Sequence, residues 1–353
     1  MSHLDDKDFL HRNDPMEMSV LTHGFLNQCQ EALSIARAVS LNENLRGKRN
    51  IVVTGLGGSA AGGDLLTALL ADQGTVPGSV NREYTMPSFV DADTLVFAAS
   101  YSGNTEETLS AYQDAKARGA AIIVVSSGGQ LSQWAVEAGY SVISVPGGQP
   151  PRTALGYMFM PLVVACEQLG YLPDQNFEDV FSATESVALT CGFEQPEAAN
   201  PAKKLAQALS GKLATIYGAG GWQYALAQRW RGQINENSKE MVVTHFFPEL
   251  CHNEILGWEG SHEQGVDEWV SVVLWGGDES QRIRDRIAIT RRLIGKATSF
   301  LDVTAMGSTR LAQMLSLAHF GDWVSLYLAA LAGRDPGRMV AIDQLKEELS
   351  RLD

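Results

Sequence analysis

The 353-residue chain is poor in positive charge and in cysteine. Its 27 Lys and Arg stand against 41 Asp and Glu, and the formal net charge of −14 excludes the broad basic surface that nucleic-acid binding requires. The four cysteines are widely spaced and form no C-x-x-C pair, so no disulfide framework is indicated. We expect buried free thiols, as in a protein of the reducing cytoplasm.

Long uninterrupted apolar runs are also missing. The run at residues 156–166 is too short to cross a membrane, and Asp322 interrupts the apolar segment 311–332. The acidic start, residues 1–8, lacks the apolar core of a secretory signal. With 45% hydrophobic and 19% charged residues, the sequence predicts a cytoplasmic globular protein without a membrane partner, long enough for two domains that each have a core.

Several catalytic and nucleotide-binding motifs are absent. The dinucleotide fingerprint requires Gly where Ala60 stands, and no Lys-Ser or Lys-Thr pair follows to make a P-loop. His252 has no second His one helical turn away, so a zinc site of the H-E-x-x-H type is not indicated, and no G-x-S-x-G elbow occurs. Nucleotide binding and serine hydrolysis are therefore disfavoured.

Strand-like and helix-like segments alternate along the first half of the chain. The strand-like runs are residues 51–54, 95–99, 121–126 and 141–145. The helical patterns are residues 14–45, 64–71, 106–118 and 131–138. This alternation predicts a mostly parallel sheet covered by helices on both faces, with ligands bound beyond the carboxyl ends of the strands.

The second half repeats this pattern. The turn Gly55-x-Gly57-Gly58 recurs 163 residues later as Gly218-x-Gly220-Gly221. Further strands are expected at residues 213–217, 241–246, 269–274 and 298–303, and a helix at 224–234. The sequence therefore predicts an α/β protein of two doubly wound domains, residues 1–195 and 196–353, joined near a linker at residues 195–201.

A hydroxyl-rich stretch, Ser100 to Thr108, follows the second strand and precedes a helix. A glycine turn, short hydroxyls and a helix N-terminus together form an anion site, and the upstream turn ending in Ser59 is a similar device. The two turns suit one phosphate ester. The alternative is a simple helix cap, with Ser102 or Asn104 as the cap and a following Glu. Trp222 replaces Ser59 in the second copy, so we expect phosphate binding only in the first half.

Two side chains outside these turns are candidates for chemistry. Arg152 lies in the first turn of an expected helix, where its charge is unfavourable for the helix dipole. It is either an exposed arginine or a group placed for an anionic ligand. Glu236 ends the helix of the second glycine turn. The segment around it is either a polar cap, with Lys239 complementing the dipole, or the setting of a carboxylate base.

Three further residues complete the candidates. His252 is either structural or catalytic; a lone His is more often structural, and its polar, aromatic and acidic neighbours add weight to the catalytic alternative. Asp322 lies in the apolar helical segment, and Lys346 lies in the C-terminal segment, where the pattern alone indicates a solvated helix lysine.

These motifs, in this order, resemble the bifunctional phosphoglucose/phosphomannose isomerases of the sugar isomerase (SIS) superfamily. The resemblance extends from about Arg49 to Lys346. The matching motifs are 57–59, 100–108, 151–152, 235–239, 252–258, 321–325 and 335–346. It implies two SIS domains, a homodimer with a shared active site, and reversible isomerisation of glucose 6-phosphate or mannose 6-phosphate with fructose 6-phosphate, without a metal or other cofactor.

The resemblance also implies residue roles. Glu236 would move a proton between C1 and C2 through a cis-enediol, and Arg152 would stabilise the enediolate. His252, from the dimer partner, would assist ring opening with Lys346. The phosphate would be held by Gly58, Ser59, Ser100, Ser102 and Thr105. The competing hypothesis is a non-catalytic SIS protein that senses a phosphosugar, although such a sensor does not need Glu236, His252 and Lys346.

Overall fold

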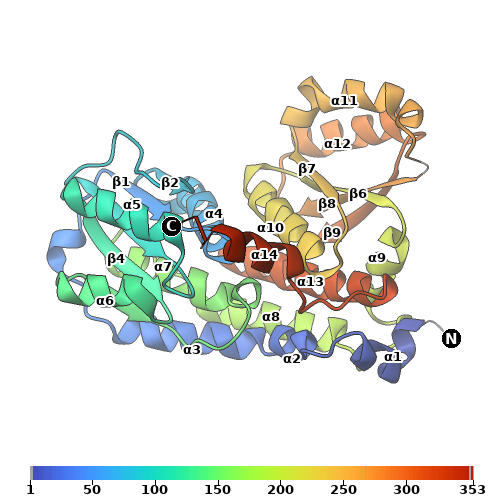
Figure 1. The fold of residues 1–353 in the computed structure, drawn as a ribbon. Helices are drawn as coiled ribbons and strands as arrows, with labels where there is room; N and C mark the ends of the chain where they lie inside the picture. The colour runs from blue at the N-terminus through green and yellow to red at the C-terminus, as the bar shows by residue number, and fades with distance from the viewer. Residues whose placement is uncertain (1–2, 267, 350, 353) are drawn as a thin grey trace.

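Each half of the chain forms one sheet in which all strands are parallel (Figure 1). The computed structural model describes residues 3–266, 268–349 and 351–352. The first sheet has the order β2-β1-β3-β4-β5, with β1 (Asn50–Thr54), β2 (Gly78–Asn81), β3 (Thr94–Ala99), β4 (Ala121–Ser126) and β5 (Ser141–Ser144). The second has the order β7-β6-β8-β9, with β6 (Leu213–Gly218), β7 (Val242–Phe246), β8 (Trp269–Trp275) and β9 (Ser299–Thr304). The predicted fold class, two doubly wound α/β units, is confirmed.

Helices cover both faces of each sheet (Figure 1). The N-terminal segment has η1 (His3–Asp5), α1 (Lys7–Arg12), α2 (Met18–His23), α3 (Phe25–Ala38) and η2 (Glu43–Leu45). The first half continues with α4 (Gly57–Gln73), α5 (Glu106–Ala117), α6 (Gly129–Glu137), η3 (Pro151–Thr153), α7 (Leu155–Gln168) and α8 (Phe177–Cys191). The second half has α9 (Pro201–Leu209), α10 (Gly221–Asn237), η4 (Glu249–His252), α11 (Glu254–Gly257), η5 (Trp258–Gln264), α12 (Gln281–Ile294), α13 (Arg310–Leu331) and α14 (Val340–Leu349).

Alternating side chains of the strands serve two different cores. In β1, Ile51 and Val53 belong to the large central cluster, whereas Val52 joins a smaller cluster with Tyr112 of α5 and Leu131 of α6. This is the alternation expected of a strand that is buried on both faces. It explains why the β-branched runs could be recognised in the sequence.

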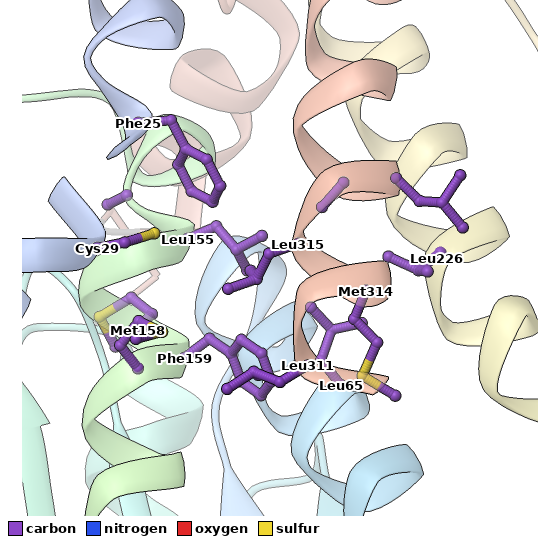
Figure 2. Packing of buried hydrophobic residues seen from close by; sticks show 14 of the residues in the cluster. Phe25, Cys29, Leu65, Leu155, Met158, Phe159, Leu226, Leu311, Met314 and Leu315 are labelled. Atoms are coloured by element: carbon purple, nitrogen blue, oxygen red, sulfur yellow. The ribbon is translucent and has the colours of Figure 1, made fainter. Parts of the chain in front are cut away.

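The central cluster extends across both halves of the chain, which differs from the expectation of a core for each domain. Figure 2 shows Leu155 and Phe159 of α7 facing Leu311 and Leu315 of α13, with Leu226 of α10 on the far side of α13. Helices α4 and α10 also pack against one another. The helices on the inner faces of the two sheets therefore form one shared layer, and this layer fixes the cleft described below.

Helix α13 has the length and apolar composition of a membrane-crossing helix. However, 94% of its most apolar window is buried inside the protein, and Asp322 within it is paired with Arg229. It forms part of the central core.

Three local features differ from the sequence expectations. The helical region expected at residues 14–45 is interrupted at Gly24, between α2 and α3. The short strand β2 was not expected, because Gly and Asn in its four residues are poor strand formers. The expected linker at residues 195–201 is anchored at one position: Asn200 is buried and its Nδ2 donates to Gly192 O (3.1 Å) and to the Tyr327 hydroxyl (3.2 Å), whereas Pro196, Ala198 and Ala199 are exposed.

Candidate functional site

The two predicted anion-binding turns lie side by side at the carboxyl ends of β1 and β3. The Tyr101 amide donates a hydrogen bond of 3.1 Å to Ser59 Oγ, which joins the two turns directly. Gly57 and Gly58 form the first turn of α4, where backbone N–H groups have no partner within the helix. The parallel register of β1 and β3 brings these distant segments together.

In the hydroxyl-rich turn, no side chain caps the N-terminus of α5. Thr105 is the N-cap residue of α5, and its side chain makes no capping hydrogen bond. Its Oγ1 instead lies 2.9 Å from Ser100 Oγ, which also accepts from the Gly103 amide. Ser102 is exposed and accepts from the Asn104 amide. The cap alternative, with Ser102 or Asn104 capping α5, does not describe this turn.

Gly58 permits a close contact between α4 and η3. A Cβ atom at position 58 would lie 2.7 Å from Pro151 O and 3.4 Å from Arg152 Cα. Both are backbone atoms, which cannot rotate away. The absence of a side chain at Gly58 therefore sets the distance between the first turn and Arg152.

Gly58→Ala is expected to separate α4 from η3. The clash should lower the free energy of unfolding by about 1–3 kcal/mol, as overpacking does in well-packed sites. Urea denaturation would measure this loss. Gly221→Ala is the matched control, because Gly221 has the same place in the second turn and its added Cβ would meet nothing within 4 Å. Equal stability of the two variants would contradict the close-contact argument.

Arg152 is buried, with 4% of its side chain exposed. Its Nε donates to Asn237 Oδ1 (2.8 Å), and its Nη2 donates to Pro336 O. Its Nη1 lies 3.8 Å from Glu236 Oε2. Burial lowers the pKa of Arg152, and the nearby carboxylates of Glu236 and Asp335 oppose this shift. The alternative of an exposed arginine is therefore wrong.

Glu236 lies in the last turn of α10, beside Arg152. Its side chain is 28% exposed. Burial raises the pKa of Glu236, while the positive charges of four neighbours oppose the shift: Arg152, Arg229, Lys239 and Lys346. A half-buried carboxylate with a raised pKa, next to a fixed cation, has the properties of a general base.

The two lysines near Glu236 have different settings. Lys239 Nζ donates to Glu236 O (2.8 Å), Asn237 O (3.1 Å) and Asp335 O (2.7 Å), so it satisfies carbonyls at the C-terminus of α10. The polar cap that the sequence suggested is thus present in addition to the carboxylate. Lys346 lies on α14, whose described residues are all exposed, and it is near enough to Glu236 for its charge to act on that carboxylate.

A cavity of about 540 Å³ runs between α4 and α10. One end is lined by Gly57, Gly58, Arg152 and Glu236, so the first turn and two of the expected chemical groups share one space. The serines and threonine of the proposed phosphate site do not line it directly. They lie beyond the Gly58 turn, to which Ser59 and Tyr101 connect them. Arg229 and Gln233, which belong to none of the sequence motifs, also line the cavity.

A signal for these two residues exists in the sequence. Arg229, Gln233 and Glu236 are spaced four and three residues apart, which places them on one face of a helix. These three polar residues form a stripe along α10, whose other buried positions are mostly apolar. In the sequence alone, such a polar stripe is typical of a helix face that is exposed to solvent.

His252 does not line this cavity, and it lies far from Glu236 within the same chain. Phe247 N donates to Gly218 O (2.9 Å), so the loop that carries His252 starts beside the carboxyl end of β6, near the start of α10. Glu236 lies 15 residues after Gly221 in α10, roughly 22 Å along the helix at 1.5 Å per residue. Figure 1 shows α11, which follows His252, at the end of the second sheet far from α14. His252 itself is exposed.

Neighbouring polar groups have structural partners. Glu254, close to His252 in the sequence, accepts a hydrogen bond from the buried Tyr217 hydroxyl. Within the described part of the chain, no group of three or more His, Cys, Asp and Glu side chains is arranged to hold a metal ion. The four cysteines are free thiols, and three of them are buried.

Two family models match this chain. The model described as SIS domain matches residues 44–149, and the model described as bacterial phospho-glucose isomerase C-terminal SIS domain matches residues 198–349. The second model includes Glu236, His252 and Lys346, and the first includes both predicted anion-binding turns.

Similar proteins cover nearly the whole chain. A bifunctional phosphoglucose/phosphomannose isomerase of Caldicellulosiruptor bescii is 44% identical over 92% of this chain and 96% of its own length. An enzyme of the same name from Thermoplasma acidophilum is 34% identical over 85% of this chain and 90% of its own. Among solved structures, a hypothetical protein of Thermus thermophilus superposes with a TM-score of 0.75 at 15% identity, covering 98% of this chain and 93% of its own.

Proposed function

The chain belongs to the family of bifunctional phosphoglucose/phosphomannose isomerases, and we propose that Glu236 is the base of its reaction. The protein is a sugar-phosphate isomerase that interconverts glucose 6-phosphate or mannose 6-phosphate with fructose 6-phosphate. One observation carries the assignment of the base: the Glu236 carboxylate lies 3.8 Å from the buried Arg152 guanidinium at the wall of the cavity.

The proposed reaction begins with binding of the phosphate by Gly58, Ser59, Ser100, Ser102 and Thr105. The N-termini of α4 and α5 contribute positive dipole ends and open N–H groups to this site. Binding energy gained at the phosphate, remote from the reacting carbons, then orients C1 and C2. Glu236 removes the proton from one of these carbons and returns it to the other through a cis-enediol. Arg152 stabilises the negative charge that develops on the enediol oxygen.

Ser102→Ala is expected to weaken the phosphate site without affecting folding, because Ser102 is exposed. Loss of one hydrogen bond to a charged group should raise KM for fructose 6-phosphate and Ki for inorganic phosphate together, by roughly tenfold. The control is Ser110→Ala, which changes an exposed serine on α5, the helix that follows the turn. Unchanged constants for Ser102→Ala would remove this residue from the site.

His252 and the quaternary structure form a second part of the proposal. A homodimer would bring His252 of one subunit to the cavity of the other, where it would open the sugar ring together with Lys346. The exposure of His252 and its separation from Glu236 within the chain support this arrangement.

A mixed-dimer experiment tests the shared site. Glu236→Gln and His252→Ala should each be nearly inactive alone. In a heterodimer with a two-fold axis, one site carries both changes and the other carries neither. Refolding the two variants together should therefore restore about a quarter of wild-type activity, since about half of the dimers are mixed. No recovery would mean that His252 acts within its own chain or not at all.

The function itself is tested by a coupled assay with glucose 6-phosphate, mannose 6-phosphate and fructose 6-phosphate, with and without EDTA. We expect turnover that EDTA leaves unchanged, since no step of the proposed route uses a metal. A melting temperature raised by a phosphosugar, in the absence of any turnover, would instead support a phosphosugar sensor.

Two further parts of the proposal concern the whole chain. We place the domain boundary between residues 195 and 196, and the family matches at residues 44–149 and 198–349 support a division there. A cytoplasmic location fits the free cysteine thiols, three of them buried.

A further inference from the structure

The cavity wall contains a second buried arginine, Arg229, that the proposed reaction does not use. Arg229 lies on α10 seven residues before Glu236, and only 3% of its side chain is exposed. It lines the same cavity as Arg152, Gln233 and Glu236. An isolated cation at such a depth would be costly, so its contacts must explain its position.

Asp322 holds Arg229 in a fixed orientation. Nη2 of Arg229 donates to Oδ1 (2.9 Å) and Oδ2 (2.8 Å) of Asp322, and also to Arg152 O (3.3 Å). Gln233 Nε2 donates to Asp322 Oδ1 (2.7 Å) and so fixes the carboxylate in turn. Asp322 is itself buried in the middle of α13. Helices α10 and α13 thus present one oriented guanidinium to the cavity.

This guanidinium has donors left over. All of its hydrogen bonds within the described residues are made by Nη2, which leaves Nη1 as the donor group open to the cavity; Nε is enclosed and has no partner there. Buried donors are almost always hydrogen-bonded. Lys203, another buried cation, shows the usual pattern: its Nζ contacts Asp5, Phe193 O and Gln195 O. An arginine that faces a cavity with unused donors is therefore typical of a ligand-binding group.

The position of Arg229 indicates which part of the ligand it binds. The phosphate belongs at the N-termini of α4 and α5, and Glu236 acts at C1 and C2. Arg229 lies on neither turn but in the α10 wall of the cavity, so under the proposed function the carbon chain is the part of the substrate that it can reach. Its unused donors suit the neutral oxygen atoms of a polyhydroxylated chain.

We propose that Arg229 binds a hydroxyl or carbonyl oxygen of the open-chain sugar phosphate, and that Asp322 is the residue that positions it. This inference rests on the proposed function, because it assumes that a sugar phosphate occupies the cavity. It assigns to the Arg229–Asp322 pair recognition of the sugar rather than of the phosphate.

The test compares a sugar phosphate with inorganic phosphate. The double variant Arg229→Gln with Asp322→Asn removes both charges, so no unpaired ion remains buried. We expect KM for fructose 6-phosphate to rise about tenfold, the effect of losing a charge-assisted hydrogen bond, while Ki for inorganic phosphate stays within about twofold of the wild type. Arg229→Lys, which keeps the charge but not the planar donors, should have an intermediate KM.

The control is a second arginine–aspartate pair outside the cavity. Arg310→Gln with Asp278→Asn removes the ion pair between Arg310 Nη2 and Asp278 (2.7 Å) and should change neither constant. A parallel rise of KM and Ki in the Arg229–Asp322 double variant would overturn the inference, since the pair would then act on the phosphate site or on folding. Unchanged constants would overturn it as well.

A binding measurement separates this inference from the proposed function. If the wild type turned over no phosphosugar, the isomerase function would fail, but calorimetric titration with fructose 6-phosphate would still report on Arg229. Tenfold weaker binding of the sugar phosphate by the double variant, with unchanged binding of inorganic phosphate, would support the inference. Equal binding of fructose 6-phosphate by wild type and double variant would overturn it.

Discussion

Glu236→Gln is expected to lower kcat by a factor of at least about 100, while fructose 6-phosphate still binds with an affinity close to that of the wild type. The amide retains the shape of the side chain but cannot accept the substrate proton. The coupled isomerase assay measures the loss of kcat, and a thermal shift with fructose 6-phosphate measures the retained binding.

Glu240→Gln is the matched control for this variant. Glu240 follows four residues later, and burial raises its pKa as well, but it does not line the cavity. We expect it to keep wild-type turnover. If Glu236→Gln also kept full turnover, the assignment of the base would be wrong.

The pH dependence provides an independent check of the same residue. Burial holds the pKa of Glu236 above its usual range, against the opposing charges of Arg152, Arg229, Lys239 and Lys346. Because a base must be unprotonated, kcat/KM should fall as the pH drops through this raised pKa. The acid limb should therefore lie at a higher pH than for an ordinary glutamate, and Glu236→Gln should lack it.

Arg152→Gln is expected to lower kcat by about 100- to 1,000-fold, the loss typical of a removed oxyanion-stabilising group. The Arg152 guanidinium is held by Asn237 and Pro336 with Nη1 directed to Glu236, so its charge is already in place before the reaction starts. The neutral side chain would leave the developing oxyanion without a cation. Steady-state kinetics would show the loss in kcat.

The stability of Arg152→Gln has to be measured together with its kinetics, because the Arg152 side chain is also packed inside the protein. Loss of the hydrogen bond to Asn237 Oδ1 should lower the free energy of unfolding by about 1–3 kcal/mol. Asn237→Ala provides a comparison, since it breaks the same hydrogen bond but keeps the charge of Arg152. A similar loss of kcat in both variants would mean that Arg152 acts through structure and not through its charge.

The sequence was sufficient for most of the fold. The strand runs ending at Thr54, Ala99 and Ser126 were recognised because β-branched and apolar residues dominate a strand that is buried on both faces. Strand β2 was missed because its sequence, Gly-Ser-Val-Asn, has neither signal. The shared core was missed because apolar patterns show that a helix is buried but not which sheet it is buried against.

The candidate site also has parts that the sequence predicts and parts that it does not. The two predicted anion-binding turns have a local signal, because glycines, hydroxyls and a helix start occur within a few consecutive residues. The close approach of Gly58 to Arg152, and of Arg152 to Glu236, joins residues 94 and 84 positions apart and had no local signal. The helical spacing of Arg229 and Gln233 alone indicates a solvated face, so it does not mark them as residues of a site.

By itself, the sequence determined the alternation of strands and helices, the repeated glycine turn and the hydroxyls at its first copy. These features follow from periodicity and turn chemistry within short windows of the chain. Only the tertiary structure decided that Arg152 is buried, that Asp322 orients Arg229, and that His252 lies away from Glu236. The reason is physical: the surroundings of these charged side chains are set by the packing of α4, α10 and α13, which come from both halves of the chain.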